Sequence, residues 1–283
     1  MQLTAFSFSP RALFAAAFSI LIASCVNADA SAENALPERI KTAGKLVFCT
    51  ELAFPPWEYI NETTLEPEGF DIDIALALTK EMGVTSDHKN IAFDGLIPAL
   101  QAGQCDAIIS GLYDKPARRE VVDFVNYAYS GNALIVKGDS TLSFKDLSEL
   151  SGLKVSVASG STLEENLVAE NAILIAAGKT AINVVALTSG TDAFQQLTAG
   201  LVDVYYGSTD QAGYFNTKKP GMVKLASKQI GALPNGVATL HKDKDLHEAI
   251  ATAFAAMQAN GAYDAVLEKW SFQDMNIKFA PAN

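Results

Sequence analysis

Short runs of apolar and β-branched residues alternate along this chain with longer segments of helical periodicity. The pattern predicts strands over residues 45–50, 107–110 and 154–157, and helices over residues 71–82 and 94–102. Strands that alternate with helices form βαβ units, in which neighbouring strands run parallel. We therefore expect an α/β fold with central, mostly parallel sheets.

A ten-residue segment occurs twice in the chain. Residues 100–109 and residues 197–206 both follow the pattern Leu-x-Ala-Gly-x-x-Asp and continue into an apolar run. In each copy the glycine is placed to end a helix in the left-handed conformation, and the aspartate precedes the next strand. Such turns also recur by chance in α/β proteins, whereas the more specific interpretation is two similar lobes. Two lobes would form a cleft at the carboxyl ends of their strands, where open α/β sheets bind ligands.

The N-terminus has the pattern of an export signal. Arg11 is the only charged side chain before a small and apolar run of roughly a dozen residues, and a transmembrane helix needs about twenty. Cleavage after Ala30 fits the small-x-small rule and is the interpretation we favour. It makes residues 1–30 a signal peptide and the protein periplasmic. The alternative is a lipobox at Cys25, which would leave an extracytoplasmic protein anchored by a lipid on that cysteine.

The composition is that of an ordinary globular chain. Of its 283 residues, 49% are hydrophobic and 19% are charged. The formal net charge of -11 would be repelled by phosphate backbones, so we expect no nucleic-acid partner. Three cysteines and three histidines leave little material for a zinc cluster, and we predict no metal and no cofactor.

Two cysteines would remain after export, in an oxidising compartment where pairing is chemically available. Cys49 lies inside a predicted strand, and Cys105 lies just before another. If those strands are parallel neighbours, the two cysteines sit near opposite ends, too far apart for a bridge. We therefore expect two buried thiols.

Groups suited to binding a carboxylate follow the second predicted strand. Ser110, Gly111 and Tyr113 precede a short helix that begins at a proline and carries Arg118. Glycine lets the backbone approach a ligand closely, and a guanidinium offers a planar fork matched to two carboxylate oxygens. The alternative for Arg118 is a surface ion pair with a neighbouring acid such as Glu120.

A second anion site is predicted where the strand over 154–157 meets the next helix. Ser161 and Thr162 stand directly before that helix, which begins near Leu163. A helix N-terminus carries free N–H donors and partial positive charge, so it favours an anion. The alternative is plain N-capping by Ser161 and Thr162, which is compatible with binding.

The loop after the first predicted strand carries three further candidates. Phe54 and Trp57 are placed to stack on a ligand, although both suit a hydrophobic core equally well. Two intervening prolines forbid a helix and stiffen the loop. Glu51 stands at the strand end and can accept hydrogen bonds from a cationic or amide group. Its alternative is a solvated loop charge.

Several blocks of the sequence resemble a known family. Residues 69–74, Gly-Phe-Asp-Ile-Asp-Ile, are similar to the signature of the family 3 bacterial extracellular solute-binding proteins, which are amino-acid receptors of ABC importers. Further blocks resemble that family in the family order: 93–100, 106–111, 118–124, and Tyr263-Asp264 followed by Trp270. The resemblance covers nearly all of residues 37–272.

The resemblance implies a receptor of the type 2 periplasmic-binding-protein fold, with a ligand cleft and a hinge of two crossovers. It implies lobe 1 over residues 37–131 plus 232–283 and lobe 2 over residues 132–231. The ligand would stabilise the closed form relative to the open form, because each lobe contributes part of the site. We expect a monomer that delivers an amino acid to an ABC permease in the cytoplasmic membrane.

The resemblance also implies roles for the candidate residues. Arg118 would bind the α-carboxylate of the ligand. Four residues would assist it: Ser110, Gly111, Tyr113 and Thr162. Phe54 and Phe93 would form an aromatic sandwich around the ligand side chain. Glu51 would read the end group of a polar or cationic amino acid.

One position departs from the family pattern. Where the family usually has an aspartate that holds the ligand ammonium, this chain has Ser208, and Asp210 follows two residues later. Either Asp210 substitutes through a local shift, or the ammonium is held differently. A third alternative is a ligand without a free primary amine, as in an opine-like conjugate. The expected ligand is therefore a polar or cationic amino acid or a derivative of one.

The competing function is a cleft enzyme. Relatives of this fold include dehydratases that act on prephenate-like acids, and Glu51 or Asp210 would then serve as the general acid. The sequence has no nucleophile–histidine arrangement, no phosphate loop and no metal constellation. His88, His241 and His247 stand in polar contexts, and we predict them at the surface. We therefore predict a binding protein rather than an enzyme.

Overall fold

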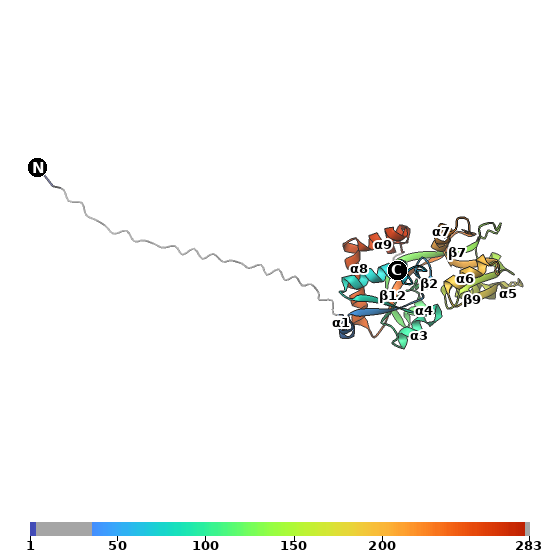
Figure 1. Ribbon diagram of the computed structural model, residues 1–283, viewed down its shortest axis with the longest axis horizontal. Helices are drawn as coiled ribbons and strands as arrows, with labels where there is room; N and C mark the ends of the chain where they lie inside the picture. The colour runs from blue at the N-terminus through green and yellow to red at the C-terminus, as the bar shows by residue number, and fades with distance from the viewer. Residues whose placement is uncertain (4–35, 281–283) are drawn as a thin grey trace. The chain divides into compact units, whose positions relative to one another are not determined.

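The computed structural model describes residues 1–3 and 36–280 (Figure 1). Most of the predicted signal peptide, with Cys25 and Ala30, lies outside these described residues. From residue 36 onward the chain folds around one nine-stranded sheet, and a separate small sheet has three strands. Within the described residues, no helix combines the length and the apolar character that a membrane crossing requires.

One group of parallel strands, with the helices on it, forms what we call lobe 1. β1 (Lys45–Thr50) pairs in parallel with β5 (Thr85–Asn90) on one side and with β6 (Ala107–Ile108) on the other. Helices cover both faces of these strands, as parallel sheets require. The helices of lobe 1 include α2 (Phe70–Glu81), α3 (Leu96–Gln101), α8 (Lys244–Ala259) and α9 (Ala262–Trp270).

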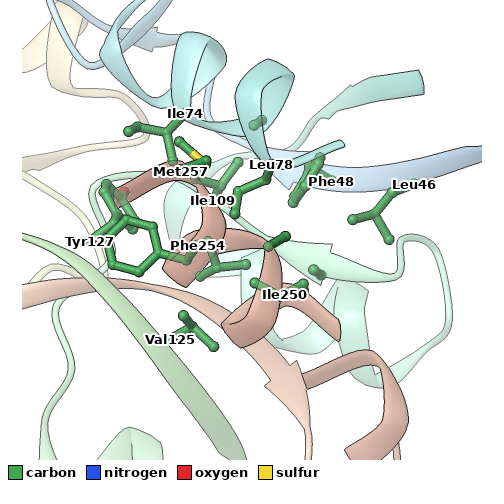
Figure 2. Close-up of a cluster of buried hydrophobic side chains, with 14 of the residues drawn as sticks. Leu46, Phe48, Ile74, Leu78, Ile109, Val125, Tyr127, Ile250, Phe254 and Met257 are labelled. Atoms are coloured by element: carbon green, nitrogen blue, oxygen red, sulfur yellow. The ribbon is translucent and has the colours of Figure 1, made fainter. Parts of the chain in front are cut away.

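The core of lobe 1 follows from the period-two alternation of β1. Leu46 and Phe48 point to one face, where Ile74 of α2 and Ile250 of α8 pack against them (Figure 2). Cys49 points to the opposite face, which α3 covers. The predicted strand over 45–50 and the helix over 71–82 are thus confirmed within one residue at each end.

A second group of parallel strands forms what we call lobe 2. β8 (Lys154–Ala158) lies between β9 (Asn183–Leu187) and β10 (Val204–Ser208), and both pairings are parallel. One face packs against α5 (Thr162–Ala176). The other face packs against α6 (Gly190–Thr198) and α7 (Thr209–Lys218). Lobe 2 therefore repeats the layering of lobe 1.

Two long strands join the lobes. β7 (Val122–Lys137) and β12 (Ile230–Leu240) pair with each other in antiparallel register, with irregularities between Ile230 and Ala232 and between Asn235 and Gly236. The order of the sheet is β5-β1-β6-β12-β7-β10-β8-β9, and β11 (Val223–Leu225) also pairs with β7. Figure 1 shows β7 running from the helices of one lobe to those of the other. These two strands are the two crossovers of the expected hinge.

The repeated sequence segment builds the same turn in each lobe. Asp106 and Asp203 each follow a helix that ends near a positive-φ glycine. The side chain of Asp106 accepts a hydrogen bond of 2.9 Å from the backbone N–H of Val47 in β1. The side chain of Asp203 accepts one of 2.8 Å from the N–H of Lys154 in β8. Each aspartate thus ties its turn to the neighbouring strand, and the two lobes share one architecture.

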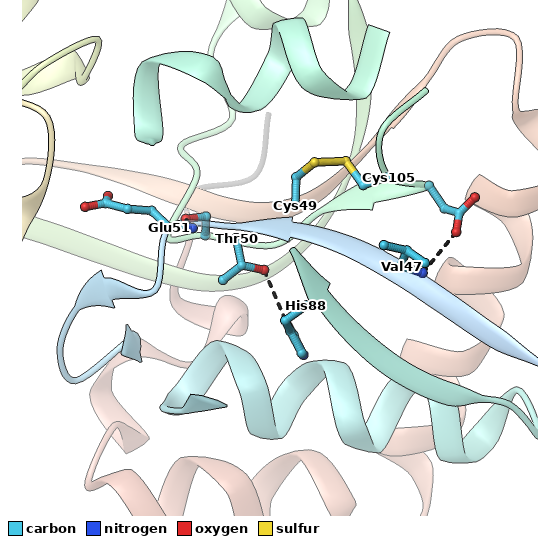
Figure 3. Close-up of a disulfide and its surroundings, with 8 residues drawn as sticks. Val47, Cys49, Thr50, Glu51, His88 and Cys105 are labelled. Atoms are coloured by element: carbon cyan, nitrogen blue, oxygen red, sulfur yellow. Dashed lines mark hydrogen bonds between the residues drawn. A yellow bond between two sulfur atoms is a disulfide. The ribbon is translucent and has the colours of Figure 1, made fainter. Parts of the chain in front are cut away.

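The expectation of two free thiols is wrong. Cys49 and Cys105 form a disulfide, with their Cα atoms 5.6 Å apart (Figure 3). The prediction placed Cys105 in register with the strand that follows it. Instead Cys105 lies in the turn after α3, on the face of the sheet to which Cys49 points. The disulfide therefore joins β1 to the turn after α3, which covers this face of the sheet, and does not link two neighbouring strands.

The surface position predicted for His88 is also wrong. His88 is half-buried in β5, stacks on Phe48 with ring centroids 5.6 Å apart, and contacts the hydroxyl of Thr50 at 3.1 Å (Figure 3). Burial lowers the pKa of His88 to about 4. A neutral imidazole can pack against apolar neighbours at little cost, which the polar sequence context does not reveal.

The remaining elements are short. Four helical turns and one helix complete the chain: α1 (Glu38–Ala43), η1 (Phe93–Gly95), η2 (Leu147–Leu150), η3 (Gln273–Met275) and η4 (Ile277–Phe279). The small sheet consists of β2 (Ala53–Phe54), β3 (Glu58–Ile60) and β4 (Pro67–Glu68). The helix that carries Arg118, α4 (Pro116–Arg119), has its proline in the first turn as expected.

Candidate functional site: a cleft between two lobes

A cavity of about 50 Å³ lies between the carboxyl ends of the strands of the two lobes. Ten of the twelve residues predicted from the sequence line it: Glu51, Phe54, Trp57, Phe93, Gly111, Tyr113, Arg118, Ser161, Thr162 and Ser208. Ser110 and Asp210 are not among its lining residues. Loops after β1 and β6 supply the wall from lobe 1, and loops after β8 and β10 supply the wall from lobe 2.

Arg118 is a buried cation in the wall of this cavity. Its side chain is only 7% exposed, so a surface ion pair does not account for it. One guanidinium nitrogen donates a hydrogen bond of 2.9 Å to the carbonyl of Tyr113, and the guanidinium lies 5.6 Å from the ring centroid of Phe93. Burial lowers the pKa of Arg118 to about 10, which keeps it charged at neutral pH. The remaining N–H groups can receive an anion.

The start of α5 faces Arg118 across the cavity. Ser161 caps this helix, because its hydroxyl accepts a hydrogen bond of 3.1 Å from the N–H of Glu164. The hydroxyl of Thr162 is buried, and it has no hydrogen-bond partner among the described residues. A buried hydroxyl beside free helix N–H groups is a donor available to a carboxylate. The capping interpretation of Ser161 is therefore correct and does not compete with binding by Thr162.

The aromatic candidates occupy different environments. Phe54 and Phe93 are half-buried and line the cavity. Trp57 is only 1% exposed and packs edge-on against Phe70 in the core of lobe 1. Its indole N–H donates a hydrogen bond of 2.9 Å to Asp210 of lobe 2. Trp57 is thus a core residue that also lines the cavity with one edge, so the core and the ligand-contact interpretations both apply to it.

Glu51 is a buried acid at the end of β1 (Figure 3). One carboxylate oxygen accepts a hydrogen bond of 2.9 Å from the N–H of Gly190, at the start of α6 in lobe 2. Burial raises the pKa of Glu51 to about 8, although the hydrogen bond from Gly190 opposes that shift. A cationic group bound next to Glu51 would stabilise the ionised carboxylate and lower its pKa again.

Ser110 and Gly111 are held from behind the cavity wall. The hydroxyl of Ser110 accepts a hydrogen bond of 2.9 Å from the backbone N–H of Glu51 and donates one of 2.7 Å to Glu58. The N–H of Gly111 donates a hydrogen bond of 2.6 Å to Asp71. Asp71 is the first aspartate of the Gly-Phe-Asp-Ile-Asp-Ile segment, so this segment fixes the loop that leads to Arg118.

Ser208 and Asp210 form the start of α7. Ser208 and Gln211 make a reciprocal capping box, which fixes the turn after β10. Both carboxylate oxygens of Asp210 are occupied, one by the indole of Trp57 and the other by the hydroxyl of Ser208. Burial raises the pKa of Asp210 to about 6. The hydroxyl of Ser208, and not the carboxylate of Asp210, forms the wall of the cavity at this end.

Sequence reasoning missed the part of the cavity that the hinge strands supply. Of the eight lining residues that were not predicted, three lie on these strands: Ser130, Asn132 and Asn235. The other five belong to β8, α5 and β10 of lobe 2: Ala158, Leu163, Tyr205, Tyr206 and Gly207. The hydroxyl of Tyr113 donates a hydrogen bond of 2.9 Å to Asn132, and Ser130 donates one of 2.8 Å to Asn235. The available signal was a polar side chain inside an otherwise apolar strand, because a buried polar group requires partners.

Direct contacts join the two lobes around the cavity. Lys115 of lobe 1 pairs with Glu165 of lobe 2 at 2.6 Å. On the other side, the hydroxyl of Thr191 donates a hydrogen bond of 2.6 Å to the carbonyl of Ala53. The cleft is therefore closed. Over residues 1–3 and 36–280, no group of three or more His, Cys, Asp or Glu side chains is arranged to hold a metal ion.

A closed cleft between two α/β lobes, lined by a buried guanidinium, a buried carboxyl and aromatic rings, defines a binding site for a small polar solute. Residues 46–274 match the family model of the bacterial extracellular solute-binding proteins, family 3. The chain belongs to this family. The sequence resemblance is thereby confirmed over most of its length.

Individual relatives support the same assignment. The chain is 29% identical to the ABC transporter arginine-binding protein 1 of Escherichia coli K12, over 81% of this chain and 91% of that protein. It is similar to the structure of an ancestral arginine-binding protein bound to arginine, with a TM-score of 0.72, 35% identity, and coverage of 80% and 98% of the two chains. An ancestral amino-acid-binding protein described as a precursor of cyclohexadienyl dehydratase is also similar, with a TM-score of 0.73, 28% identity, and coverage of 82% and 98%.

Proposed function

We propose that this chain is the substrate-binding component of an ABC importer and that its ligand is a polar or cationic amino acid or a derivative of one. The observation that carries the proposal is the presence of Arg118 and Glu51 in the wall of one cavity. Arg118 offers a cation to a carboxylate, and Glu51 offers an acid to a cationic or amide end group. The arginine-binding relatives are consistent with a ligand that carries both groups.

The candidate ligands differ in whether their α-amine is free, substituted or absent. Asp210 is engaged by Trp57 and Ser208 and does not line the cavity, so an α-ammonium would have to draw its carboxylate toward the ligand or be bound by neutral groups. A ligand with a substituted or absent α-amine would avoid that cost. L-arginine, Nα-acetyl-L-arginine and 5-guanidinopentanoate differ only at this end, and calorimetric titration with the three ranks these alternatives.

We further propose that the protein works outside the cytoplasm as a monomer and passes its ligand to a permease in the membrane. Cleavage after Ala30 would release it, whereas acylation at Cys25 would anchor it. Lobe 1 would comprise residues 37–131 plus 232–283, and lobe 2 residues 132–231. The chain passes between these two parts in β7 and β12, which supports closure as a hinge motion.

The second candidate function is a cleft enzyme, and the ancestral relative linked to a dehydratase is the observation in its favour. Glu51, with its pKa raised to about 8, could donate a proton near neutral pH. We nevertheless propose binding without turnover, because the curated relatives of this chain are amino-acid-binding proteins.

Native mass spectrometry of the protein as purified tests the proposal directly. A retained small molecule with a carboxylate and a cationic or amide end group would support it, and its mass would identify the derivative. Incubation of the protein with that molecule separates the two functions, since a receptor returns it unchanged and an enzyme converts it. A protein that binds only uncharged compounds would contradict the proposal.

A further inference from the structure

Two carboxyl groups are buried side by side behind the wall of the ligand cavity. Glu58 lies on β3 and Asp71 lies in the first turn of α2, and both are fully buried. Both oxygens of Asp71 have donors, since Tyr127 donates to one at 2.8 Å and the N–H of Gly111 donates to the other at 2.6 Å. Asp71 is therefore surrounded as an ionised carboxylate should be.

Glu58 is surrounded differently. One oxygen accepts the hydrogen bond of 2.7 Å from the hydroxyl of Ser110. The other oxygen, Oε2, is buried and receives no donor from any described residue. Ser110 and Gly111 are consecutive in the chain and bind Glu58 and Asp71 respectively, so the two carboxyls lie behind one loop. Burial raises the pKa of Glu58, and the charge of Asp71 raises it further. Two carboxyls in contact can share a hydrogen bond only if one of them carries a proton.

We propose that Glu58 is a neutral carboxylic acid at physiological pH, that it donates its proton in a hydrogen bond to Asp71, and that the pair positions Ser110 and Gly111 for the ligand. The alternative, two ionised carboxylates in contact, would combine desolvation of both charges with their mutual repulsion. It would also leave the second oxygen of Glu58 bare. A single shared proton removes the repulsion, leaves one charge to be desolvated in place of two, and gives the second oxygen of Glu58 a partner.

The charges around the pair act in the same direction. Burial, followed by the charge of Asp71, raises the pKa of Glu58 well above its ordinary value. Glu51 at the end of β1 adds to this shift. Burial, with a smaller effect of Asp210, raises the pKa of Asp71 to about 7, and the hydrogen bonds from Gly111 and Tyr127 oppose that shift, so Asp71 is the carboxyl that more readily stays ionised. The titratable group that faces the pair from β7 is Tyr127, whose own pKa is raised, so it remains a neutral donor.

The pair connects three elements of lobe 1. The N–H of Glu51 reaches Glu58 through the hydroxyl of Ser110, and the N–H of Gly111 reaches Asp71 directly. The residues that follow β1 and β6 are thus hydrogen-bonded to Glu58 and Asp71, and the proton shared by these two carboxyls completes the connection to the start of α2. Glu58 and Asp71 do not line the cavity, so they are positioning residues and not binding residues.

The proton is tested by infrared spectroscopy of the ligand-free mature protein at pH 7. A Glu51→Gln background removes the other buried acid with a strongly raised pKa. The band of a protonated carboxylic acid should be present in this background and should decrease when Glu58→Gln is added. Asp71→Asn should remove the same contribution while Glu58 is still present, because an asparagine amide can donate to an ionised Glu58. A band unchanged by either substitution would overturn the proposal.

The positioning role is tested by amide hydrogen exchange, again without ligand. Glu58→Gln can still accept from Ser110 and donate to Asp71, so Glu51 and Gly111 should keep their protection. Glu58→Leu can do neither, and exchange at these two amides should become at least tenfold faster. Equal protection in both variants, or equal loss in both, would contradict positioning by a neutral acid.

Affinity links the pair to the proposed function. L-arginine, used as the probe, should bind Glu58→Gln within about threefold of the parent protein and Glu58→Leu at least tenfold more weakly. Should the parent protein not bind L-arginine, that ligand assignment fails, whereas the infrared and exchange measurements still decide the proposal.

Discussion

The carboxylate of Glu51 in lobe 1 accepts a hydrogen bond of 2.9 Å from the backbone N–H of Gly190 in lobe 2. An acid at the end of one strand thus caps the first turn of α6 across the cleft, where the helix carries partial positive charge. The same carboxyl lines the ligand cavity. Closure of the lobes and recognition of a cationic ligand therefore use one chemical group.

Substitution of Glu51 should change how stability depends on pH. The pKa of Glu51 in the folded protein is about 8, above its value of 4.5 as a free side chain. Its contribution to stability is therefore complete below pH 4.5 and decreases as the pH rises toward 8. Glu51→Gln, which can still accept from Gly190, should flatten this decrease, so the variant should be relatively more stable at pH 8 than at pH 5.

Denaturant unfolding of both proteins at several pH values measures this effect. The difference between the two curves reports the titration of Glu51 together with its smaller effect on the pKa of Glu58. Curves that run parallel from pH 5 to pH 8 would show that Glu51 does not carry the raised pKa. In the presence of a cationic ligand the difference should become smaller, since the ligand favours the charged form of Glu51 in the parent protein.

Arg118→Ala should weaken binding of a carboxylate ligand by about 2 kcal/mol or more, which is roughly 30-fold in affinity. Arg119→Ala is the matched control, because Arg119 is the next residue, has a side chain that is 49% exposed and pairs with Asp114. Its affinity should stay within about twofold of the parent protein. Calorimetry with the ligand identified by mass spectrometry makes the comparison, and an equal loss in both variants would remove Arg118 from the site.

The disulfide should stabilise the fold without affecting the ligand. The loop that it closes has a sequence separation of 56 residues, for which chain entropy predicts about 4 kcal/mol. The double variant Cys49→Ser, Cys105→Ser should lose stability of this order in denaturant unfolding. Its ligand affinity should be nearly unchanged, because neither sulfur lines the cavity. A reducing agent should destabilise the parent protein and leave the double variant as it is.

The sequence predicted those features that depend on local pattern. The strand over 45–50 and the helix over 71–82 follow from periodicity, and the repeated Leu-x-Ala-Gly-x-x-Asp segment correctly indicated two similar lobes. Arg118 and Thr162 were found because residues that follow strands of an α/β sheet gather at one edge. These signals lie within a few residues of the groups that they locate.

Other features depend on contacts between distant segments. The disulfide was missed because the turn after α3 takes Cys105 out of register with β6, and no local pattern specifies that departure. Asn132 and Asn235 were missed because they meet only when β7 and β12 pair. Glu58 and Asp71 are 13 positions apart in the chain and look like solvated charges, and only their common burial behind Ser110 gives them a role.

Closure of the cleft should depend on the lack of a side chain at Gly160. A Cβ atom at this position of lobe 2 would lie 2.7 Å from the Cβ and 2.9 Å from the Cα of Asp94 in lobe 1. Gly160→Ala should therefore hold the lobes apart and weaken ligand binding at least tenfold.

The substitution also strains the backbone, because Gly160 has a φ of +70°. Gly178 of lobe 2 has the same φ of +70° and no atom within 4 Å of its Cβ position, so Gly178→Ala reproduces the strain without the contact. Small-angle scattering with saturating ligand should show a larger radius of gyration for Gly160→Ala than for Gly178→Ala, and equal radii with equal affinities would contradict the prediction.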